Sequence, residues 1–168
     1  METINVMPKQ GIGLIKLGMS KEEVEKCRQE YNAKFYRDNP SYEFFDGTFK
    51  VEYDTEGKVN FIELSSVKGE QEFTCTVLEL DIFETKAEDL VEKIDIVSSY
   101  DRNDWELGYS YHFPELGLCF WRPVIFKDSD MEEEWFKAHD KENQESYLRD
   151  QYFRTVAVAV EGYWNKSK

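Results

Sequence analysis

Residues 18–24 read Gly-Met-Ser-Lys-Glu-Glu-Val, and residues 85–91 read Thr-Lys-Ala-Glu-Asp-Leu-Val. In each stretch a Ser or Thr is followed three residues later by Glu, and an amphipathic run comes after it. This is the pattern of a capping box, in which the two side chains bond the free backbone amides at a helix start. The sequence therefore predicts two helices that begin near Ser20 and Thr85, 65 residues apart.

The same two-part pattern continues beyond each helix start. An alternating aromatic run, a four-residue turn that ends in Gly, and a second run follow, with the turns at 54–57 and 114–117. Alternation is the period of a half-buried strand, and Gly supplies the positive φ of a hairpin turn. Six paired positions share one offset of 60: Phe49/Tyr109, Val51/Tyr111, Tyr53/Phe113, Gly57/Gly117, Val59/Cys119 and Phe61/Trp121. We expect two tandem helix-β-hairpin repeats, about 12–66 and 78–126.

The segments outside the two hairpins complete the expected fold. Residues 128–150 are highly charged, without Gly or Pro, and predict a helical insertion, whereas 152–160 alternates small residues with Val and predicts a final strand. We expect one α+β domain over 1–168, with a curved antiparallel sheet. We also expect a short lead at 1–11, a turn at 38–40, a loop at 68–70, and strands at 73–83 and 124–126.

Composition and charge restrict the function. The chain has 168 residues, 15% aromatic residues and a formal net charge of -14. A core built on aromatic side chains can be large even when Leu and Ile are few, so the chain is long enough for one folded domain. Nucleic acids and anionic membranes need a cationic surface, and we therefore expect neither as a partner. Such a charge favours a basic partner, although acidity for solubility alone explains it equally well.

The cysteines and the N-terminus indicate a compartment. Cys27, Cys75 and Cys119 form an odd set without a C-x-x-C spacing, so we expect free thiols in a reducing environment. The sequence contains neither a charged leader followed by an apolar stretch nor a run long enough to span a membrane. We expect a cytoplasmic protein.

Residues 14–24 resemble a known helix start. Gly18-Met19-Ser20 with Val24 is similar to the Gly-Met-Thr/Ser-x-x-x-Val start of the BamE-type lipoprotein domain and of the beta-lactamase inhibitor protein family. The resemblance implies a tandem of helix-then-hairpin repeats whose sheet forms a concave protein-binding face. The second start departs from the pattern, since Glu84 replaces Gly and no Met precedes Thr85. Without a lipobox cysteine or a signal peptide, neither the lipoprotein role nor a periplasmic beta-lactamase target is implied.

In size, charge and composition the chain also resembles immunity proteins (antitoxins) of bacterial polymorphic-toxin systems. These are stand-alone, cytoplasmic, aromatic-rich α+β domains without active sites. The resemblance implies a protein partner, a basic secreted toxin domain, and no cofactor.

Residues with catalytic or metal-binding chemistry do not converge in the sequence. His112 alternates with Tyr111 and Phe113 and is expected to face away from them. A Cys-His nucleophile pair would require Cys119 or Cys75 to meet His112 across strands; Cys119 and His112 both lie near the second turn, but the favoured interpretation is that both are structural. Glu134, His139 and Asp140 offer too few ligands for a metal at their spacing. We expect no catalytic, cofactor or metal residues and no enzyme activity.

An acidic, aromatic-studded stretch is the most distinctive polar feature. Acidic charge speeds encounter with a cationic partner and aromatic side chains provide binding hot spots. The predicted partner-binding residues are Asp130, Glu132, Glu133, Glu134, Trp135 and Phe136, with Tyr109, Tyr111 and Trp121 of the second hairpin. The other interpretation is a solvated helix whose aromatic residues pack on the sheet. An immunity protein is the leading functional hypothesis; a structural or regulatory domain and a small enzyme are the alternatives.

Overall fold

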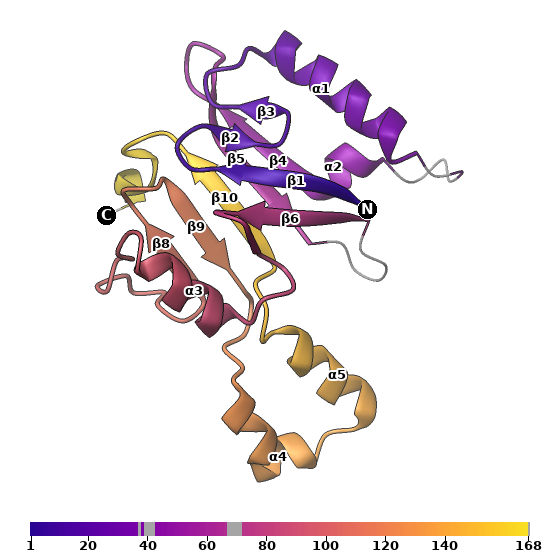
Figure 1. Cartoon of the computed structure of the whole chain (residues 1–168), viewed down its shortest axis with the longest axis vertical. Helices are drawn as coiled ribbons and strands as arrows, with labels where there is room; N and C mark the ends of the chain where they lie inside the picture. The colour runs from indigo at the N-terminus through magenta and orange to yellow at the C-terminus, as the bar shows by residue number, and fades with distance from the viewer. Residues whose placement is uncertain (37, 39–42, 67–71, 168) are drawn as a thin grey trace.

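The chain is an α+β protein with two five-stranded sheets, which confirms the predicted class (Figure 1). The computed structural model describes residues 1–36, 38, 43–66 and 72–167. The predicted loop at 68–70 lies outside the described residues, as does the turn at 38–40 apart from Asp38. We call the sheet of order β3-β2-β1-β6-β7 the N-terminal sheet, and that of order β4-β5-β10-β9-β8 the hairpin sheet.

The hairpin sheet contains both predicted hairpins. β4 (Phe49–Tyr53) pairs with β5 (Val59–Ser65), and β8 (Ser110–Phe113) pairs with β9 (Leu118–Trp121), each antiparallel. Gly57 and Gly117 have φ values of 75° and 62°, as the two turns require. A side chain at Gly117 would also place its Cβ 3.0 Å from the carbonyl oxygen of Ala159.

β10 (Thr155–Ala159), in the segment predicted at 152–160, is the central strand of the hairpin sheet. It lies between the two hairpins and pairs antiparallel with β5 and β9. All five of its residues are buried, because both faces of the strand are covered. The predicted edge strand at 124–126 is wrong: no strand forms there, since the chain leaves the sheet after Arg122-Pro123.

The N-terminal sheet was not predicted. It consists of β1 (Glu2–Met7), β2 (Gly11–Ile12), β3 (Ile15–Lys16), β6 (Phe73–Val77) and β7 (Leu80–Asp81). β1 and β6 are parallel, so the expectation of a single antiparallel sheet is wrong, and β1 lies in the segment that was expected to be only a short lead. The predicted long strand at 73–83 breaks at Leu78 and Glu79, whose φ values of 49° and 67° turn the chain back on itself.

The helix starts agree with the prediction only in part. Ser20 caps α1 (Lys21–Lys34) with the predicted capping box: its Oγ accepts from the Glu23 amide at 3.2 Å. α3 (Ala87–Asp95) begins two residues after Thr85, but its cap position is Lys86 and has no side-chain hydrogen bond. Instead, the amide of Ala87 donates to the carbonyl oxygen of Gln151 at 2.8 Å. A capping box is therefore not needed at the second start.

The tandem repeat stays a prediction. α1 precedes the first hairpin and α3 precedes the second, yet the two halves differ in their other elements. The first half alone has the short helix α2 (Phe44–Thr48), and α1 has 14 residues against 9 for α3.

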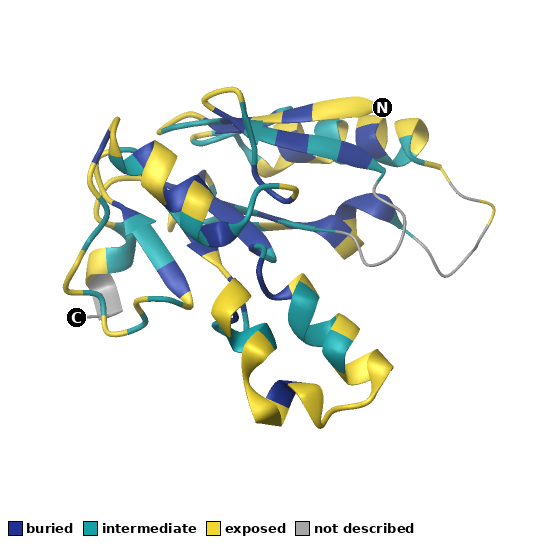
Figure 2. Ribbon diagram, turned by 60° about the horizontal axis from the view of Figure 1, so that its bottom comes forward, coloured by how far each residue is buried: buried dark blue, intermediate teal, exposed yellow. Residues whose placement is uncertain are grey.

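The core lies between two layers. The N-terminal sheet and helices α1 and α3 cover one face of the hairpin sheet, and apolar residues from all of them form one cluster (Figure 1). Buried positions gather along the strands, whereas the region of α4 and α5 is mostly exposed (Figure 2). The largest fully buried aromatic residues are Phe44, Phe73, Phe113, Phe120, Phe126 and Phe153.

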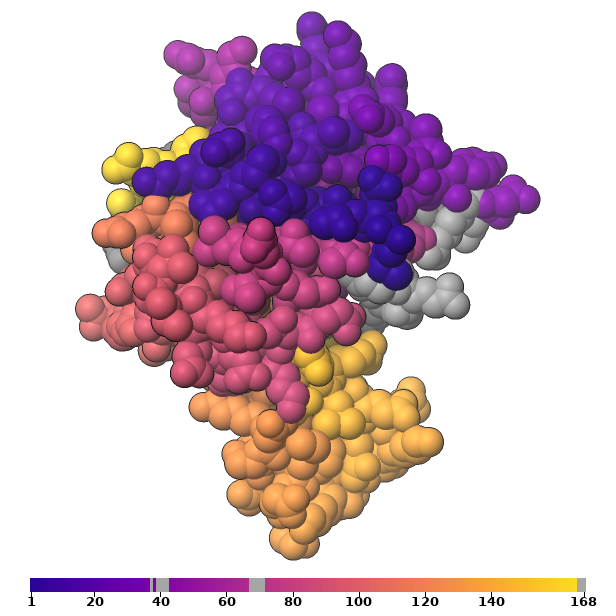
Figure 3. Space-filling view, viewed as in Figure 1, coloured from indigo at the N-terminus to yellow at the C-terminus, as the bar shows by residue number. Residues whose placement is uncertain are grey.

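The predicted helical insertion forms a separate projection, which we call the helical lobe (residues 128–150). It contains the 3₁₀ helix η1 (Asp128–Glu132), α4 (Glu134–Lys137) and α5 (Lys141–Arg149). The lobe extends from the body beyond the end of both sheets (Figures 1 and 3). Across the described part of the chain, no helix has the length and apolar character needed to cross a membrane.

Candidate partner-binding surfaces

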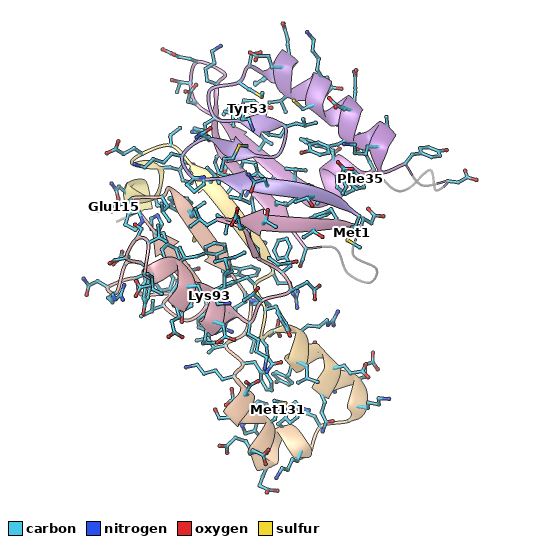
Figure 4. The ribbon with its side chains drawn as sticks, viewed as in Figure 1. Met1, Phe35, Tyr53, Lys93, Glu115 and Met131 are labelled. Atoms are coloured by element: carbon cyan, nitrogen blue, oxygen red, sulfur yellow. The ribbon has the colours of Figure 1, made fainter. Side chains whose placement is uncertain are left out.

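The aromatic residues of the helical lobe pack on one another. Phe126, at the base of the lobe, is fully buried, and its ring centroid lies 5.3 Å from that of Phe136 and 5.6 Å from that of Tyr147. Trp135 meets Phe126 edge-on at 6.2 Å. Figure 4, in which Met131 marks the lobe, shows the lobe apart from the two sheets. The expectation that they pack on the sheet is therefore wrong.

Of the two predicted aromatic anchors in the lobe, Phe136 is buried and Trp135 is exposed. Phe136 is only 8% exposed, because it fills the small aromatic core of the lobe, so it cannot insert into a partner. Trp135 is 44% exposed and keeps one side of its indole at the surface. Its predicted role in binding therefore remains compatible with its position.

The acidic side chains cover the lobe surface as predicted. Residues 128–150 contain nine Asp and Glu residues and three Lys and Arg residues, and all of the acidic residues except Asp150 are at least partly exposed. Glu132, Glu133 and Glu134 are exposed. Asp130 also has a local role, since its Oδ2 accepts from the Lys127 amide at 2.9 Å and closes the first turn of η1. The lobe thus presents a concentrated negative charge on a projecting surface.

Arg122 joins the lobe to the body and was missed in the sequence. Its side chain is fully buried at the base of the lobe. Nη2 donates to Glu88 of α3 at 2.5 Å, Nε donates to the Gly108 carbonyl at 3.0 Å, and Nη1 donates to the Asp150 carbonyl at 3.2 Å. These bonds connect the end of the lobe with a helix and a loop of the body.

A second connection lies beside Arg122. The Asp128 carboxylate accepts from Lys86 at 2.6 Å and from the side-chain amide of Gln151 at 2.5 Å. The hydrogen bond from Lys86 holds the pKa of Asp128 below its ordinary value. The first residue of the lobe is thereby tied to Lys86 at the start of α3 and to Gln151, the residue that follows the lobe.

The predicted aromatic residues of the second hairpin do not share one face. Tyr111 packs edge-on against Tyr100 and Phe153, on the core side of the hairpin sheet. Trp121 is on the other side, where it is 40% exposed, and Tyr109 is exposed beyond the start of β8. Only Trp121 therefore belongs to the outer face of the sheet.

The outer face of the hairpin sheet carries polar and small side chains. Glu63, Ala157, Cys119 and His112 follow one another across four neighbouring strands. His112 faces away from the core-side residues Tyr111 and Phe113, as predicted.

The segment at the C-terminal end of the described chain covers part of the outer face. The helix η2 (Tyr163–Ser167) stacks Tyr163 on Phe61 at 4.9 Å and places Trp164 edge-on against His112 at 4.4 Å. Ala157 and Ala159 lie beneath these rings. The small residues of β10 thus allow the close approach that their alternation indicated.

Beside this segment lies a cavity of about 380 Å³, which we call the outer-face hollow. Thr155, Ala157 and Cys119 belong to the strands that form its floor, and their small side chains leave the space open. Three tryptophans and four carboxylates also line it: Trp105, Trp121, Trp164, Glu63, Asp101, Asp104 and Glu106. Of these, sequence analysis singled out only Trp121 as a binding residue.

Residues 101–109 form a well-connected loop along one side of the hollow. Arg102 binds Asp95 of α3 with two hydrogen bonds of 2.7 and 2.8 Å and stacks on the Tyr100 ring at 3.8 Å. The Asp104 carboxylate accepts from the Glu106 amide at 2.9 Å. Although Trp105 is 90% exposed, the loop that carries it is thus fixed at several points.

The thiol in the hollow is unsuited to nucleophilic catalysis. Burial, together with the nearby charges of Asp104, Glu106 and Glu63, raises the pKa of Cys119 to about 12. A reactive cysteine needs the opposite, an electropositive setting that lowers its pKa. Within the part of the chain that is described, no group of three His, Cys, Asp or Glu side chains could hold a metal ion.

A larger cavity of about 730 Å³ lies on the other side of His112 and Trp164. Lys9, Glu115 and Glu161 line it, so its charge is mixed and favours neither a cation nor an anion. The acidic outer-face hollow has the more specific chemistry.

Glu63 is expected to reduce the stability of the chain near neutral pH. Burial raises its pKa above the ordinary value of 4.5, and Lys50 of the neighbouring strand offsets the effect only in part. Because the unfolded chain loses this proton first as pH rises, stability falls between the ordinary and the raised pKa. Glu63→Gln should therefore raise the thermal midpoint near pH 7, and the gain should vanish at pH values below 4.5.

Thermal melts of wild type and variant across pH measure this effect. Glu56→Gln, at an exposed position of the first hairpin turn, is the matched control and should change little. An equal gain at every pH would show that the charge of Glu63 is not its cause.

No protein-family model, no curated protein and no solved structure matches this chain. The resemblances to the BamE-type and beta-lactamase inhibitor domains and to immunity proteins therefore stay predictions. The function must be inferred from the acidic lobe and the outer-face hollow.

Proposed function

We propose that this chain is a non-enzymatic, cytoplasmic binding domain for a basic protein, and that it acts as an immunity protein. In that role it neutralises a cognate bacterial toxin by covering the active site of the toxin. The observation that carries the proposal is the projecting lobe, in which eight acidic and three basic residues of 128–150 are at least partly exposed. A chain that is acidic for solubility alone does not need to concentrate charge on one projection.

The position of the charge supports fast and specific association. Glu132, Glu133 and Glu134 lie on a part of the molecule that reaches beyond the body, where a partner meets them first (Figure 3). Acidic surfaces attract basic partners over about one Debye length, roughly 8 Å at physiological salt. Trp135, half-exposed beside these charges, offers apolar surface that can slow dissociation once contact is made.

The attachment of the lobe supports a role in binding as well. The buried Arg122 and the Lys86–Asp128 pair fix the lobe to the body at both of its ends. A surface that is already ordered loses less conformational entropy on binding than a loose one. The lobe is therefore suited to present its charges in a fixed arrangement.

Capture from the native cell tests the proposal. Wild type and a Glu132→Lys, Glu133→Lys, Glu134→Lys variant are immobilised side by side, and bound proteins are identified by mass spectrometry. We expect a basic protein that wild type retains and the variant loses. Expressed alone in a bacterial host, that protein should arrest growth, and coexpression of wild type should restore it.

Two results would contradict the proposal. The first is that every captured protein binds wild type and variant equally. The second is that the protein lost by the variant leaves growth unchanged when expressed alone.

A further inference from the structure

The outer-face hollow combines two features that favour a cation. Its lining includes the acidic residues Glu63, Asp101, Asp104 and Glu106, and no lysine or arginine is among the described residues that line it. Trp105, Trp121 and Trp164 add three indole rings. Indole faces attract cations through their quadrupole, and Trp is the strongest of the aromatic side chains in this respect.

The acidic residues of the hollow come from separate parts of the hairpin sheet. Glu63 is on β5, and Glu106 is in the loop before β8. Between Glu63 and Cys119 stands only Ala157 of β10, so their backbones are two strand spacings, roughly 10 Å, apart. The small side chains of Ala157 and Cys119 leave room beside Glu63 for the end of one side chain.

Two of the three tryptophans that line the hollow are exposed. Trp105 is 90% exposed and Trp121 is 40% exposed, although burying a large aromatic side chain is favourable. The loop that carries Trp105 is held by the Arg102–Asp95 pair, and Glu106 accepts from the Ser110 hydroxyl at 3.2 Å. The ring surface is thus presented by a fixed loop.

A cation of the chain already lies over an aromatic ring at the border of the hollow. The Lys50 ammonium lies over the Phe61 ring at 5.9 Å, next to Glu63. Lys50 does not itself line the hollow. On this face of the sheet a positive charge thus lies beside both an aromatic ring, Phe61, and an acidic residue, Glu63.

We propose that the outer-face hollow binds the guanidinium group of an arginine side chain presented by the basic partner protein. This inference rests on the proposed function for the source of the arginine. A guanidinium is planar, stacks on aromatic faces, is weakly hydrated and carries five N–H donors that suit carboxylate acceptors. A lysine ammonium is more strongly hydrated and stacks less well, so it binds more weakly here.

A peptide titration tests the hollow without the partner. The probe is the capped tripeptide acetyl-Gly-Arg-Gly-amide, followed by NMR shifts of the indole N–H groups. The matched ligand control replaces arginine by citrulline, which has nearly the same shape without the charge. A lysine peptide and tetramethylammonium distinguish a guanidinium site from a general cation site.

The expected result is a Kd of about 1 mM or below for the arginine peptide, at least about fivefold tighter than for the other three ligands. Trp121→Ala and Glu63→Gln should each weaken arginine binding by about fivefold or more. Tyr36→Ala, at an exposed position after α1, and Glu56→Gln, at an exposed position of the first hairpin turn, are the protein controls and should bind as wild type does. Glu63→Gln should lose affinity while it gains thermal stability, which a purely structural role would not produce.

Equal binding of arginine and citrulline peptides, equal binding of the lysine peptide, or no loss in the two hollow variants would overturn this inference. A failed titration leaves the capture experiment unaffected, because that experiment compares variants of the lobe alone. Conversely, arginine binding without any captured basic protein would contradict the proposed function and not the chemistry of the hollow.

Discussion

Replacing Arg122 by Met is expected to lower the free energy of unfolding by about 3 kcal/mol, and the thermal midpoint by about 6–12 °C for a chain of this size. The side chain is fully buried, and Met fills much of its volume without its donors. The carbonyl oxygens of Gly108 and Asp150 then lose their hydrogen bonds in a buried place, and Glu88 loses its cation. Hydrogen exchange in the lobe should accelerate more than exchange in β5.

Arg102→Met is the matched control, because Arg102 also makes a two-bonded pair with a carboxylate but lies at the surface. Exposed pairs contribute little, so its effect should be much smaller. Arg122→Lys should fall between the two, since an ammonium group cannot reach all of the partners of the guanidinium. Equal effects of Arg122→Met and Arg102→Met would contradict the role given to Arg122.

Converting Glu132, Glu133 and Glu134 to Lys is expected to lower the association rate with the captured partner by about tenfold or more. Attraction between an acidic lobe and a basic partner speeds encounter, and reversal of three charges removes much of it. The dependence of the rate on salt should weaken in parallel. All three side chains are exposed, so the thermal midpoint should stay close to that of wild type.

The matched control reverses three exposed glutamates elsewhere: Glu22 and Glu30 of α1 and Glu56 of the first hairpin turn. This variant has the same net charge as the lobe variant, but α1 lies at the other end of the molecule (Figure 1). Stopped-flow kinetics should show a smaller loss of rate for it. An equal loss in both variants would mean that net charge, and not the lobe, directs association.

Local signals were predicted correctly because few residues decide them. The Ser20 capping box depends on groups three residues apart, and the hairpin turns depend on Gly57 and Gly117 within four residues. The pair of β1 and β6 depends on strands about 70 residues apart, and periodicity does not reveal which strands pair. Thr85 had the capping pattern, yet the Gln151 carbonyl, far along the chain, satisfies that helix start.

The candidate surfaces were predicted less completely. Exposure of the lobe glutamates follows from their charge, whereas the burial of Phe136 depends on Phe126 at the base of the lobe. No sequence signal marks a buried arginine such as Arg122. The exposure of Trp105 could have been predicted. It directly follows the turn-rich run Asp101-Arg102-Asn103-Asp104, where no alternating pattern indicates a buried position. The place of Glu63 in the hollow depends on β10 and β9, which lie beside β5 in space but far from it in the sequence.

Hydrogen exchange of the chain, alone and bound to the captured basic protein, tests the central claim that the lobe and the outer-face hollow form the binding surface. The account predicts slower exchange at residues 101–109, along the hollow, and at residues 128–137, in the first part of the lobe, with α1 unchanged. Slower exchange confined to α1 and β4, with both of those segments unaffected, would contradict it.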